Sequence, residues 1–348
     1  MTTAELNARE RQVLAAVIRS YVETAEPAGS RTVSRRFALG VSAATVRNTM
    51  SDLEEKGFLF HPHTSAGRIP TEKAYRVYVD ELMGVAPLNA AERDRLKIEI
   101  GQGTATLESI LRRAAQSLGV LSQELGVALG PRLDQTVLAS VELVRLSAER
   151  LMLVLSLRGG AVRTIFIEVS GQIGDDALSE VKAVLNDRLS GLTLAEIRSS
   201  LSSRLRDSAT TSGSRDLLNI FLQEGEQMFD VPAAADGDAV VLGQASVLAD
   251  QPEFGNAERM RRLIELTETR TELEQVLRSR RKAGGVQVTI GAENGESFPG
   301  GMTVVTAEYK VGSLSGVIGV IGPTRMPYEK VISLVSHTSS LVTDLLDG

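Results

Sequence analysis

The sequence predicts an α+β protein with more than one domain. Three observations lead to this prediction. The chain has 348 residues, more than one compact domain usually contains. Apolar residues follow a helical period up to about residue 130, and runs rich in β-branched residues replace this period from Pro131 onward. The hydrophobic content of 43% is sufficient for several buried cores.

Composition excludes several kinds of site. The chain has no cysteine, so it can form neither disulfides nor thiolate metal sites. The N-terminal residues 1–14 are charged and lack the apolar core of a signal peptide. No run approaches the roughly 18 apolar residues that span a bilayer. We therefore expect a cytoplasmic protein with no membrane partner.

The first helix is predicted over residues 5–24. Asn7 and Glu10 have the spacing of a capping box, in which each side chain accepts a hydrogen bond from the other's amide. Apolar residues recur at helical spacing on one side, and this side is the expected core face. Its members are Val13, Leu14, Val17, Ile18 and Tyr21.

Two further helices, separated by a tight turn, are predicted over residues 30–40 and 42–56. Ser30 and Ser42 have side chains suited to cap the free amides of a first helical turn. Gly40 and Gly57 can take the left-handed conformation that ends helices. On the later helix, one face is apolar and consists of Ala43, Val46, Met50 and Leu53. The opposite face is small or polar and consists of Ala44, Arg47, Asn48 and Ser51, with Thr45 at its edge.

A short β-hairpin is predicted directly after these helices. Residues 58–60 and 68–69 form its strands, and Pro70 ends the pairing because it has no amide hydrogen. A helix with slim residues at its start and hydrogen-bonding residues beyond suits the DNA major groove. A hairpin behind such a helix is a wing whose tip lies along the DNA backbone. The pattern predicts a winged helix-turn-helix domain over residues 1–84.

The predicted DNA-binding residues lie on the later helix and on the hairpin. Thr45, Arg47 and Asn48 are the candidates for base contacts. The candidates for phosphate contacts are Ser42, His63, Thr64, Ser65, Arg68 and the amide of Gly67. Ala44 and Ser51 complete the predicted DNA-facing side. The alternative is that Arg47 and Arg68 are solvated surface charges.

The charge distribution allows a DNA partner although the net charge is −6. Residues 27–76 contain eight Lys and Arg against four Asp and Glu. DNA responds to this local excess because charges beyond about 8–10 Å are largely screened at physiological salt. The excess is modest, so tight binding should need two such modules on one duplex.

The strings SAATVRN, from Ser42, and HTSAGRIPTEKAYR, from His63, resemble the heat-inducible transcription repressor HrcA family. Weaker similarity extends to QPEF at 251–254, IGAEN at 290–294 and GVIGVIGPTRMPY at 316–328. The resemblance implies a homodimer that binds an inverted-repeat operator in double-stranded DNA. It also implies repression of class I chaperone operons, release on heat stress, and a GroEL-type chaperonin as a partner.

Residues 71–130 are predicted to be mainly helical. Thr71 caps a helix whose Tyr75 and Tyr78 face the core, and a linker over residues 84–89 marks a domain boundary. Lys73 and Arg76 suit either a phosphate or solvent. Residues 85–130 then form a linker and packing helices. Their leucine stripe, which runs from Leu107 to Leu129, could form a dimer seam or pack on its own domain.

Residues 131–348 are predicted to form a regulatory domain with an antiparallel sheet. Strand-like runs follow Pro131, a helix covers residues 175–189, and strands and a long helix return near the C-terminus. The resemblance implies that this domain is GAF-like. We read residues 190–250 as an inserted helical dimerisation segment. Its apolar residues could instead pack on their own sheet; they are Leu217, Leu218, Ile220, Phe221, Leu222 and Phe229.

Other motifs have plain structural explanations. His61 and His63 lack a nearby third metal ligand. The glycines at 316, 319 and 322 lack the Lys-Ser/Thr of a phosphate-binding loop, so close packing explains them. Glu293 and Asn294 could hold a small ligand, or form a turn with Asn294 in the left-handed conformation. We predict no metal, no cofactor and no enzymatic activity.

The combined prediction is a negative regulator of heat-shock transcription. Two alternatives remain open. One is a metabolite-responsive winged-helix regulator with an effector pocket in the GAF-like domain. The other is a protein-interaction module whose winged helix binds protein.

Overall fold

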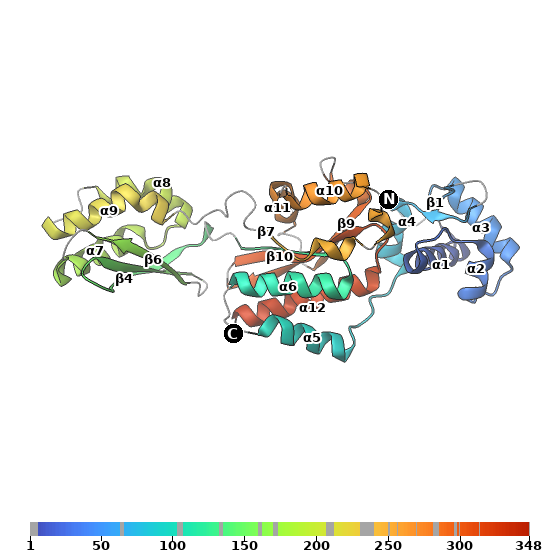
Figure 1. Ribbon diagram of the computed structural model, residues 1–348, viewed down its shortest axis with the longest axis horizontal. Coiled ribbons are helices and arrows are strands. Elements are labelled where there is room, and N and C mark those ends of the chain that lie inside the picture. Colours follow the sequence, from blue (N-terminus) through green and yellow to red (C-terminus); the bar gives the residue numbers. More distant parts are fainter. Residues whose placement is uncertain are drawn as a thin grey trace. The chain divides into compact units, whose positions relative to one another are not determined.

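A computed structural model gives the fold, which mixes helices with antiparallel sheets (Figure 1). It confirms the α+β class. The chain divides into two compact units. The first contains Met1–Leu129, Val240–Glu308 and Val317–Val342, and the second contains Gly130–Ala239 with two short segments, Tyr309–Gly316 and Thr343–Gly348. The structure describes residues 6–62, 66–102, 107–131, 135–158, 162–169, 173–206, 212–229, 240–249, 251–255, 257–268, 270–280, 285–295, 298, 300–312 and 314–347.

The N-terminal part of the first unit contains the predicted helices and hairpin. Its elements are α1 (Ala8–Thr24), α2 (Ser30–Arg36), α3 (Ala43–Glu55), β1 (Leu59–Phe60), β2 (Ile69–Pro70), α4 (Glu72–Val77) and a π-helical turn η2 (Tyr78–Leu82). The capping box of α1 is confirmed, because the Asn7 side chain accepts from the Glu10 amide at 3.0 Å and Glu10 accepts from the Asn7 amide at 2.9 Å. Thr71 caps α4 as predicted.

Helix α2 is shorter than predicted. Its N-cap is Gly29 rather than Ser30, and the helix ends at Arg36. Val33 is its buried residue, while Phe37 is half-buried and Ala38 is exposed in the left-handed conformation. The helix ends early because both Ala38 and Gly40 have positive φ values.

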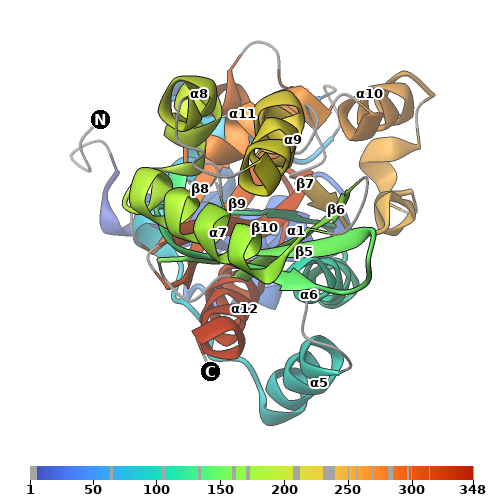
Figure 2. The same ribbon diagram turned by 90° about the vertical axis from the view of Figure 1, so that its left-hand side faces the viewer.

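The rest of the first unit is built on a five-stranded sheet. The strand order is β7-β3-β10-β9-β8, and the pairs with a described register are antiparallel. Figures 1 and 2 show α6 and α12 on one face of the sheet and α11 on the other. The strands are β3 (Leu125–Leu129), β7 (Val240–Leu242), β8 (Val286–Ile290), β9 (Met302–Val311) and β10 (Leu314–Pro323). The helices are α5 (Ala90–Gly101), α6 (Leu107–Ser122), α10 (Ala257–Glu268), α11 (Arg270–Arg278) and α12 (Tyr328–Asp347), with single turns η5 (Ala245–Leu248), η6 (Pro252–Phe254) and η7 (Gly291–Asn294).

Strand β3 corrects the prediction of continuous helix to residue 129. Helix α6 ends at Ser122, and Gln123 reverses the chain with a φ of 62°. Strand β3 then returns so close to α6 that a Cβ on Gly126 would lie 1.8 Å from the Ala115 carbonyl oxygen. Leu125 and Leu129 are therefore buried as sheet residues, not as members of a helical stripe. The first unit does not divide at the predicted linker over residues 84–89.

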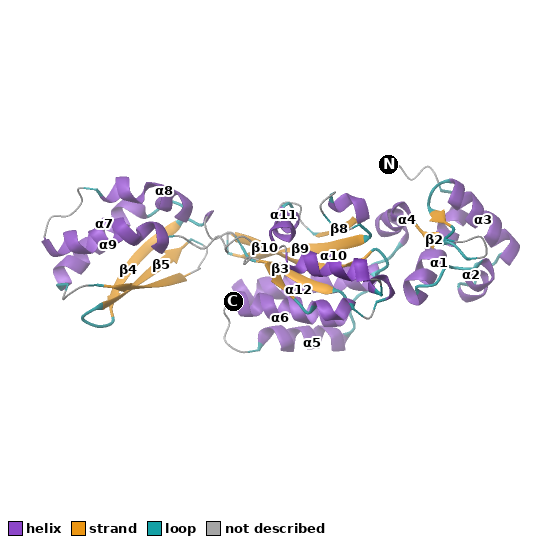
Figure 3. Ribbon diagram, turned by 45° about the horizontal axis from the view of Figure 1, so that its top comes forward, coloured by secondary structure: helices purple, strands orange, loops and turns teal. Residues whose placement is uncertain are grey.

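The second unit has its own three-stranded sheet, covered by three helices. The strands are β4 (Leu138–Arg145), β5 (Arg150–Leu157) and β6 (Val162–Glu168), in the order β4-β5-β6, and the helices are α7 (Asp175–Leu189), α8 (Leu194–Leu205) and α9 (Ser212–Met228). Figure 3 shows the helices gathered on one side of this sheet. Strands β5 and β6 pair antiparallel, and residues 159–161 between them lie outside the described part of the chain.

This unit corrects two predictions. The strands after Pro131 do not join the C-terminal sheet, so the insertion covers about 130–239 instead of 190–250. The apolar residues of α9 pack on their own sheet, because Leu217 and Phe221 join a core with Leu153 and Leu155 of β5. Helix α9 therefore does not need a second chain to bury its apolar side.

The opposite face of the three-stranded sheet remains uncovered in the described chain. Phe166 is 67% exposed, Val162 is 64% exposed and Val144 is 41% exposed. Met152 on the central strand pairs with both Phe166 and Val144, so these side chains form one continuous apolar patch.

Among the residues that the structure describes, every helix is too short or too polar to span a lipid bilayer.

Candidate nucleic-acid interface

Helix α3 begins with the cap that the sequence predicts. The Ser42 hydroxyl accepts from the Thr45 amide at 3.1 Å and lies 2.9 Å from the Thr45 hydroxyl. Three of the four predicted inner residues are confirmed, because Val46, Met50 and Leu53 are at most 3% exposed. The fourth, Ala43, is only half-buried. Cap and core contacts together fix the rotation of the helix about its axis, and this rotation decides which residues face outward.

The outer face of α3 presents free hydrogen-bonding groups. Ala44, Arg47 and Asn48 are exposed, and Thr45 and Ser51 are half-buried. The Ser51 hydroxyl donates to the Arg47 carbonyl at 3.2 Å, so it is already occupied within the helix. Within the described chain, the side chains of Arg47 and Asn48 have no hydrogen-bond or ion-pair partner. These two side chains are free to bind a ligand.

The C-terminal end of α3 is held against α1. The Lys56 ammonium contacts both carboxylate oxygens of Glu10 at 2.9 Å, and Glu10 is 4% exposed. Burial favours protonation of Glu10, but hydrogen bonds from Lys56 and from the Asn7 amide outweigh it and lower the pKa of Glu10. The carboxylate therefore stays ionised at neutral pH, and its contribution to stability is lost only as the pH falls through this lowered pKa.

The hairpin lies against the loop before α2. Arg68 and Ala28 exchange two backbone hydrogen bonds, of 2.8 and 3.0 Å. A Cβ on Gly67 would lie 2.5 Å from the Pro27 and Ala28 carbonyl oxygens, so only glycine fits here without a shift. Gly67 is half-buried and serves this close approach. The predicted tip residues His63, Thr64 and Ser65 lie outside the described residues.

Arg68 occupies a different environment from the one predicted. Its side chain is 14% exposed, and its guanidinium lies 2.7 Å from the Glu54 carboxylate and 2.9 Å from Nδ1 of His61. Because Glu54 belongs to α3, this ion pair ties the hairpin to the C-terminal half of that helix. The geometry favours an internal anchor over the predicted phosphate contact.

A groove of about 480 Å³ separates α3 from the hairpin. Arg47 and Ser51 line it from α3, and Ala66 and Gly67 line it from the hairpin. Gly29 and Ser30, at the start of α2, close its third side. The groove is mixed in polarity and has a free guanidinium on its wall, which suits a polar, anionic ligand.

Ion pairs reduce the local positive charge that the sequence predicts. Lys56 pairs with Glu10, Arg68 with Glu54, Arg36 with Glu23, and Arg76 with Glu293. Arg76 also donates to the Val288 carbonyl oxygen at 3.0 Å. Its guanidinium is therefore bound within the first unit, in neither of the two environments that the sequence suggested, phosphate or solvent. Lys73 lies 4.2 Å above the centre of the Phe58 ring.

Arg31 and Arg35 are cations that the sequence analysis counted but did not assign. Both are exposed on α2, and neither has an ion-pair or hydrogen-bond partner among the described residues. Their spacing of four residues places them on one side of the helix. In the sequence, the signal for these two cations was their spacing of four residues on the helix before the candidate recognition helix.

The other motifs have internal structural roles. The Glu293 carboxylate accepts from the Ile290 amide at 2.9 Å, and the Asn294 amide donates to the Met302 carbonyl at 3.0 Å. Gly295, not Asn294, has the positive φ, which corrects the predicted turn. A Cβ on Gly319 would lie 2.0 Å from the Val305 carbonyl oxygen, which confirms close packing there. The described residues contain no group of His, Asp and Glu that could hold a metal.

Comparison with known proteins confirms the resemblance found in the sequence. A family model for the HrcA protein C terminal domain matches residues 108–332. Proteins named heat-inducible transcription repressor HrcA from Chlorobium limicola and Geobacter sulfurreducens are 39% and 37% identical to this chain, with 99% of each chain covered. These relatives are repressors, which agrees with the prediction that the protein is not an enzyme.

One solved structure shares the fold. It is described as a hypothetical protein at 2.2 Å resolution and aligns with a TM-score of 0.66 at 22% identity. The alignment covers 98% of this chain and 99% of that chain. At this identity the similarity concerns the fold alone.

The Arg68 anchor leads to a stability prediction. Arg68→Ala should lower the free energy of unfolding by about 1–3 kcal/mol, because Glu54 loses its charged partner in a partly buried site. Urea unfolding followed by circular dichroism measures this change. Arg35→Ala is the control and should shift stability by less than about 0.5 kcal/mol. An Arg68→Ala protein as stable as the unchanged chain would contradict the anchoring role.

Proposed function

The chain belongs to the HrcA family of heat-inducible transcription repressors, and from this premise we propose that residues 1–84 form a winged helix-turn-helix that binds operator DNA. Helix α3 is the recognition helix and the β1–β2 hairpin is the wing. The observation that carries the proposal is the outer face of α3, where Arg47 and Asn48 are exposed and have no partner among the described residues.

The roles of the outer-face residues follow from their chemistry. A guanidinium can donate two hydrogen bonds to guanine, and an amide side chain can both donate to and accept from adenine. We assign base contacts to Arg47 and Asn48, with Thr45 beside them. The small side chain of Ala44 allows the N-terminal end of α3 to enter the major groove. The Ser42 hydroxyl, at the N-cap of α3, is assigned to a phosphate contact.

Backbone contacts are assigned to a revised set of residues. Arg31 and Arg35 on α2 supply positive charge that no described residue neutralises. The first helix of a helix-turn-helix crosses the DNA backbone. The tip residues His63, Thr64 and Ser65 remain predicted phosphate contacts. Arg68 and Gly67 hold the hairpin in place, so their contribution to binding is positional.

An inverted-repeat operator requires two copies of the chain related by a two-fold axis. We propose that the second unit supplies the dimer contact through the uncovered face of its sheet. Phe166, Met152 and Val144 form an apolar patch there, larger than isolated exposed residues would make. A second copy of the same face is the occupant, because an isologous contact pairs the patch with itself.

The regulatory part of the proposal rests on the family. The five-stranded sheet with its helices is assigned as the GAF-like regulatory domain. The operator controls heat-shock chaperone genes, heat releases the repressor, and a GroEL-type chaperonin helps to keep it active.

An electrophoretic mobility shift with a chaperone-promoter inverted repeat tests the proposal. Specific retardation that unlabelled operator competes away, and scrambled DNA does not, supports operator binding. Equal competition by both DNAs, or no retardation, rejects it and favours a winged helix that binds protein.

Arg47→Ala should weaken operator binding by about 1–3 kcal/mol and relax sequence preference at one base pair, because a bidentate base contact is lost. Titration of the operator and of its single-base variants measures both effects. Unchanged affinity for the operator would remove α3 from the recognition role.

Arg31→Ala and Arg35→Ala should each weaken binding to all DNA sequences alike. Each change should also reduce the slope of log affinity against log salt by about one, because one phosphate contact is lost. Lys97→Ala, an exposed lysine on α5, is the control and should leave the slope unchanged. A changed base preference in either arginine variant would place that arginine at a base.

Phe166→Glu should raise the dimer dissociation constant by at least about tenfold, because it places a carboxylate in the apolar contact. Analytical ultracentrifugation over a concentration series measures this constant. Val85→Glu is the control, since Val85 is 61% exposed and lies outside the patch. Equal dissociation constants for both variants would exclude this face as the dimer surface.

A further inference from the structure

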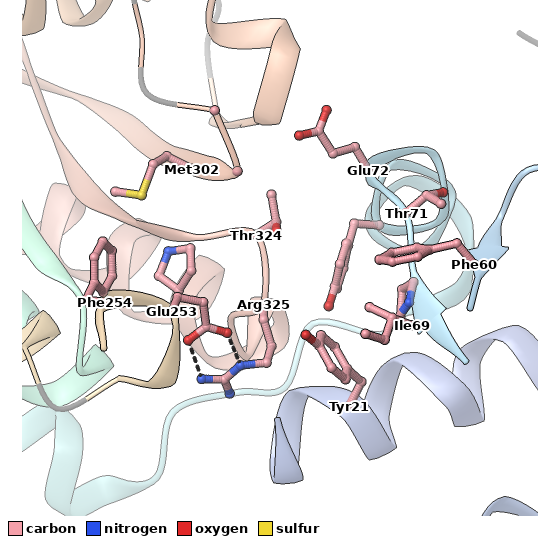
Figure 4. A pocket seen from close by; sticks show the side chains of 15 residues that line it. Tyr21, Phe60, Ile69, Thr71, Glu72, Glu253, Phe254, Met302, Thr324 and Arg325 are labelled. Atoms are coloured by element: carbon pink, nitrogen blue, oxygen red, sulfur yellow. Dashed lines mark hydrogen bonds and ion pairs between the residues drawn. The ribbon is translucent and has the colours of Figure 1, made fainter. Parts of the chain in front are cut away.

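The first unit contains a cavity of about 600 Å³ that the proposed function does not use. Residues of α1, the hairpin and α4 line one side, and residues of η6, the start of β9 and the end of β10 line the other. Figure 4 shows Tyr21, Phe60 and Ile69 facing Glu253, Phe254 and Met302 across this space. The volume lies in the range of small-molecule sites, about 300–1,000 Å³.

The walls are mainly apolar. Phe60 is 44% exposed although it is a large hydrophobic residue, and it borders the cavity. Ile69, Pro70 and Pro323 extend this apolar lining. A ring compound placed here would cover Phe60, and the removal of this apolar surface from water favours binding.

One wall carries a hydrogen-bonding group that lacks a partner. The Tyr75 side chain lines the cavity and is 2% exposed, and its hydroxyl has no hydrogen bond within the described structure. A buried hydroxyl without a hydrogen-bond partner destabilises the folded protein, so a ligand that supplies the partner gains affinity. Burial raises the pKa of Tyr75 well above its usual value, so the hydroxyl keeps its proton near neutral pH.

The charges around the cavity limit the ligand class. Arg325 and Glu253 form a two-pronged ion pair with N–O distances of 2.5 and 3.0 Å, and Arg325 also donates to the Val22 carbonyl at 2.8 Å. This pair is neutral as a whole. Glu72 adds a negative charge, and one of its carboxylate oxygens accepts from the Ala292 amide at 3.1 Å. The lining therefore has a net negative charge, which disfavours anions.

We propose that this cavity binds a neutral or cationic, largely apolar ring compound with one hydrogen-bonding group that meets the Tyr75 hydroxyl. Such a ligand contacts the hairpin and α4 on one side and β9 and η6 on the other. Its regulatory consequence rests on the proposed DNA binding. If the bound ligand alters the hairpin, it alters operator affinity, and the operator alters ligand affinity by the same factor.

Three small probes that differ mainly in charge test the ligand class. Benzyl alcohol is neutral, benzylamine is cationic and benzoate is anionic at neutral pH. Saturation-transfer NMR with the full chain, without DNA, measures their binding. We expect benzyl alcohol and benzylamine to bind at least about tenfold more tightly than benzoate, a difference of about 1.4 kcal/mol. Failure of both to bind, or equal binding of all three, overturns the proposal.

Variants locate the binding site. Gly300 lines the cavity, and a Cβ there would meet nothing within 4 Å, so Gly300→Leu fills the space without displacing backbone. This variant should lose probe binding. Gly84→Leu is the matched control, because Gly84 is equally open and lies outside the cavity. Tyr75→Phe should weaken benzyl alcohol binding about three- to tenfold. Undiminished binding to Gly300→Leu overturns the assignment.

Operator titration with and without benzyl alcohol tests the regulatory consequence. We expect saturating probe to change the operator dissociation constant severalfold for the unchanged chain and not for Gly300→Leu. An unchanged constant while NMR shows the probe bound overturns the regulatory role. If the unchanged chain binds no operator at all, the proposed function is rejected instead. The NMR measurement then still shows whether the cavity binds the probes.

Discussion

The N-terminal part of the structure depends on the single apolar side of helix α3. Val46, Met50 and Leu53 can be buried together only if the opposite side faces outward, because the helical period fixes the angle between them. Arg47 and Asn48 are therefore exposed as a geometric consequence of the core. The Ser42 cap fixes the start of the helix, and the Lys56–Glu10 ion pair holds its far end. A large change in this core would rotate the outer face and so misplace both side chains.

The elements with strong local signals could be predicted from the sequence. The capping box at Asn7 and Glu10, the caps at Ser42 and Thr71, and the helix Asp175–Leu189 all lie where their patterns place them. Strand β3 could not be predicted in this way, because Leu125 and Leu129 also continue the leucine spacing of α6. The deciding contact is between Gly126 and Ala115, and it exists only once the chain has reversed at Gln123. The division into two sheets was missed for a related reason. A strand pattern in the sequence does not specify which other strand it will pair with.

The candidate interface divides in the same way. Helical geometry predicts the exposure of Arg47 and Asn48, because exposure follows from spacing. The environment of Arg68 depends on Glu54, which lies on another element, and no spacing in the sequence reveals that pair. Arg31 and Arg35 became distinct only when four neighbouring cations, Arg36, Lys56, Arg68 and Arg76, were found in ion pairs. A count of charges gave the sign of the surface, but the structure was needed to identify the available cations.

The Arg68–Glu54 pair affects how the proposed complex with nucleic acid dissociates when ionic strength rises. Mobile ions weaken contacts between exposed cations and phosphates, but they screen a partly buried pair much less. In the proposed complex, raised ionic strength should therefore release the nucleic acid while the DNA-binding domain stays folded. Release and rebinding would then be reversible without a refolding step, because the Arg68–Glu54 pair keeps the hairpin attached to α3.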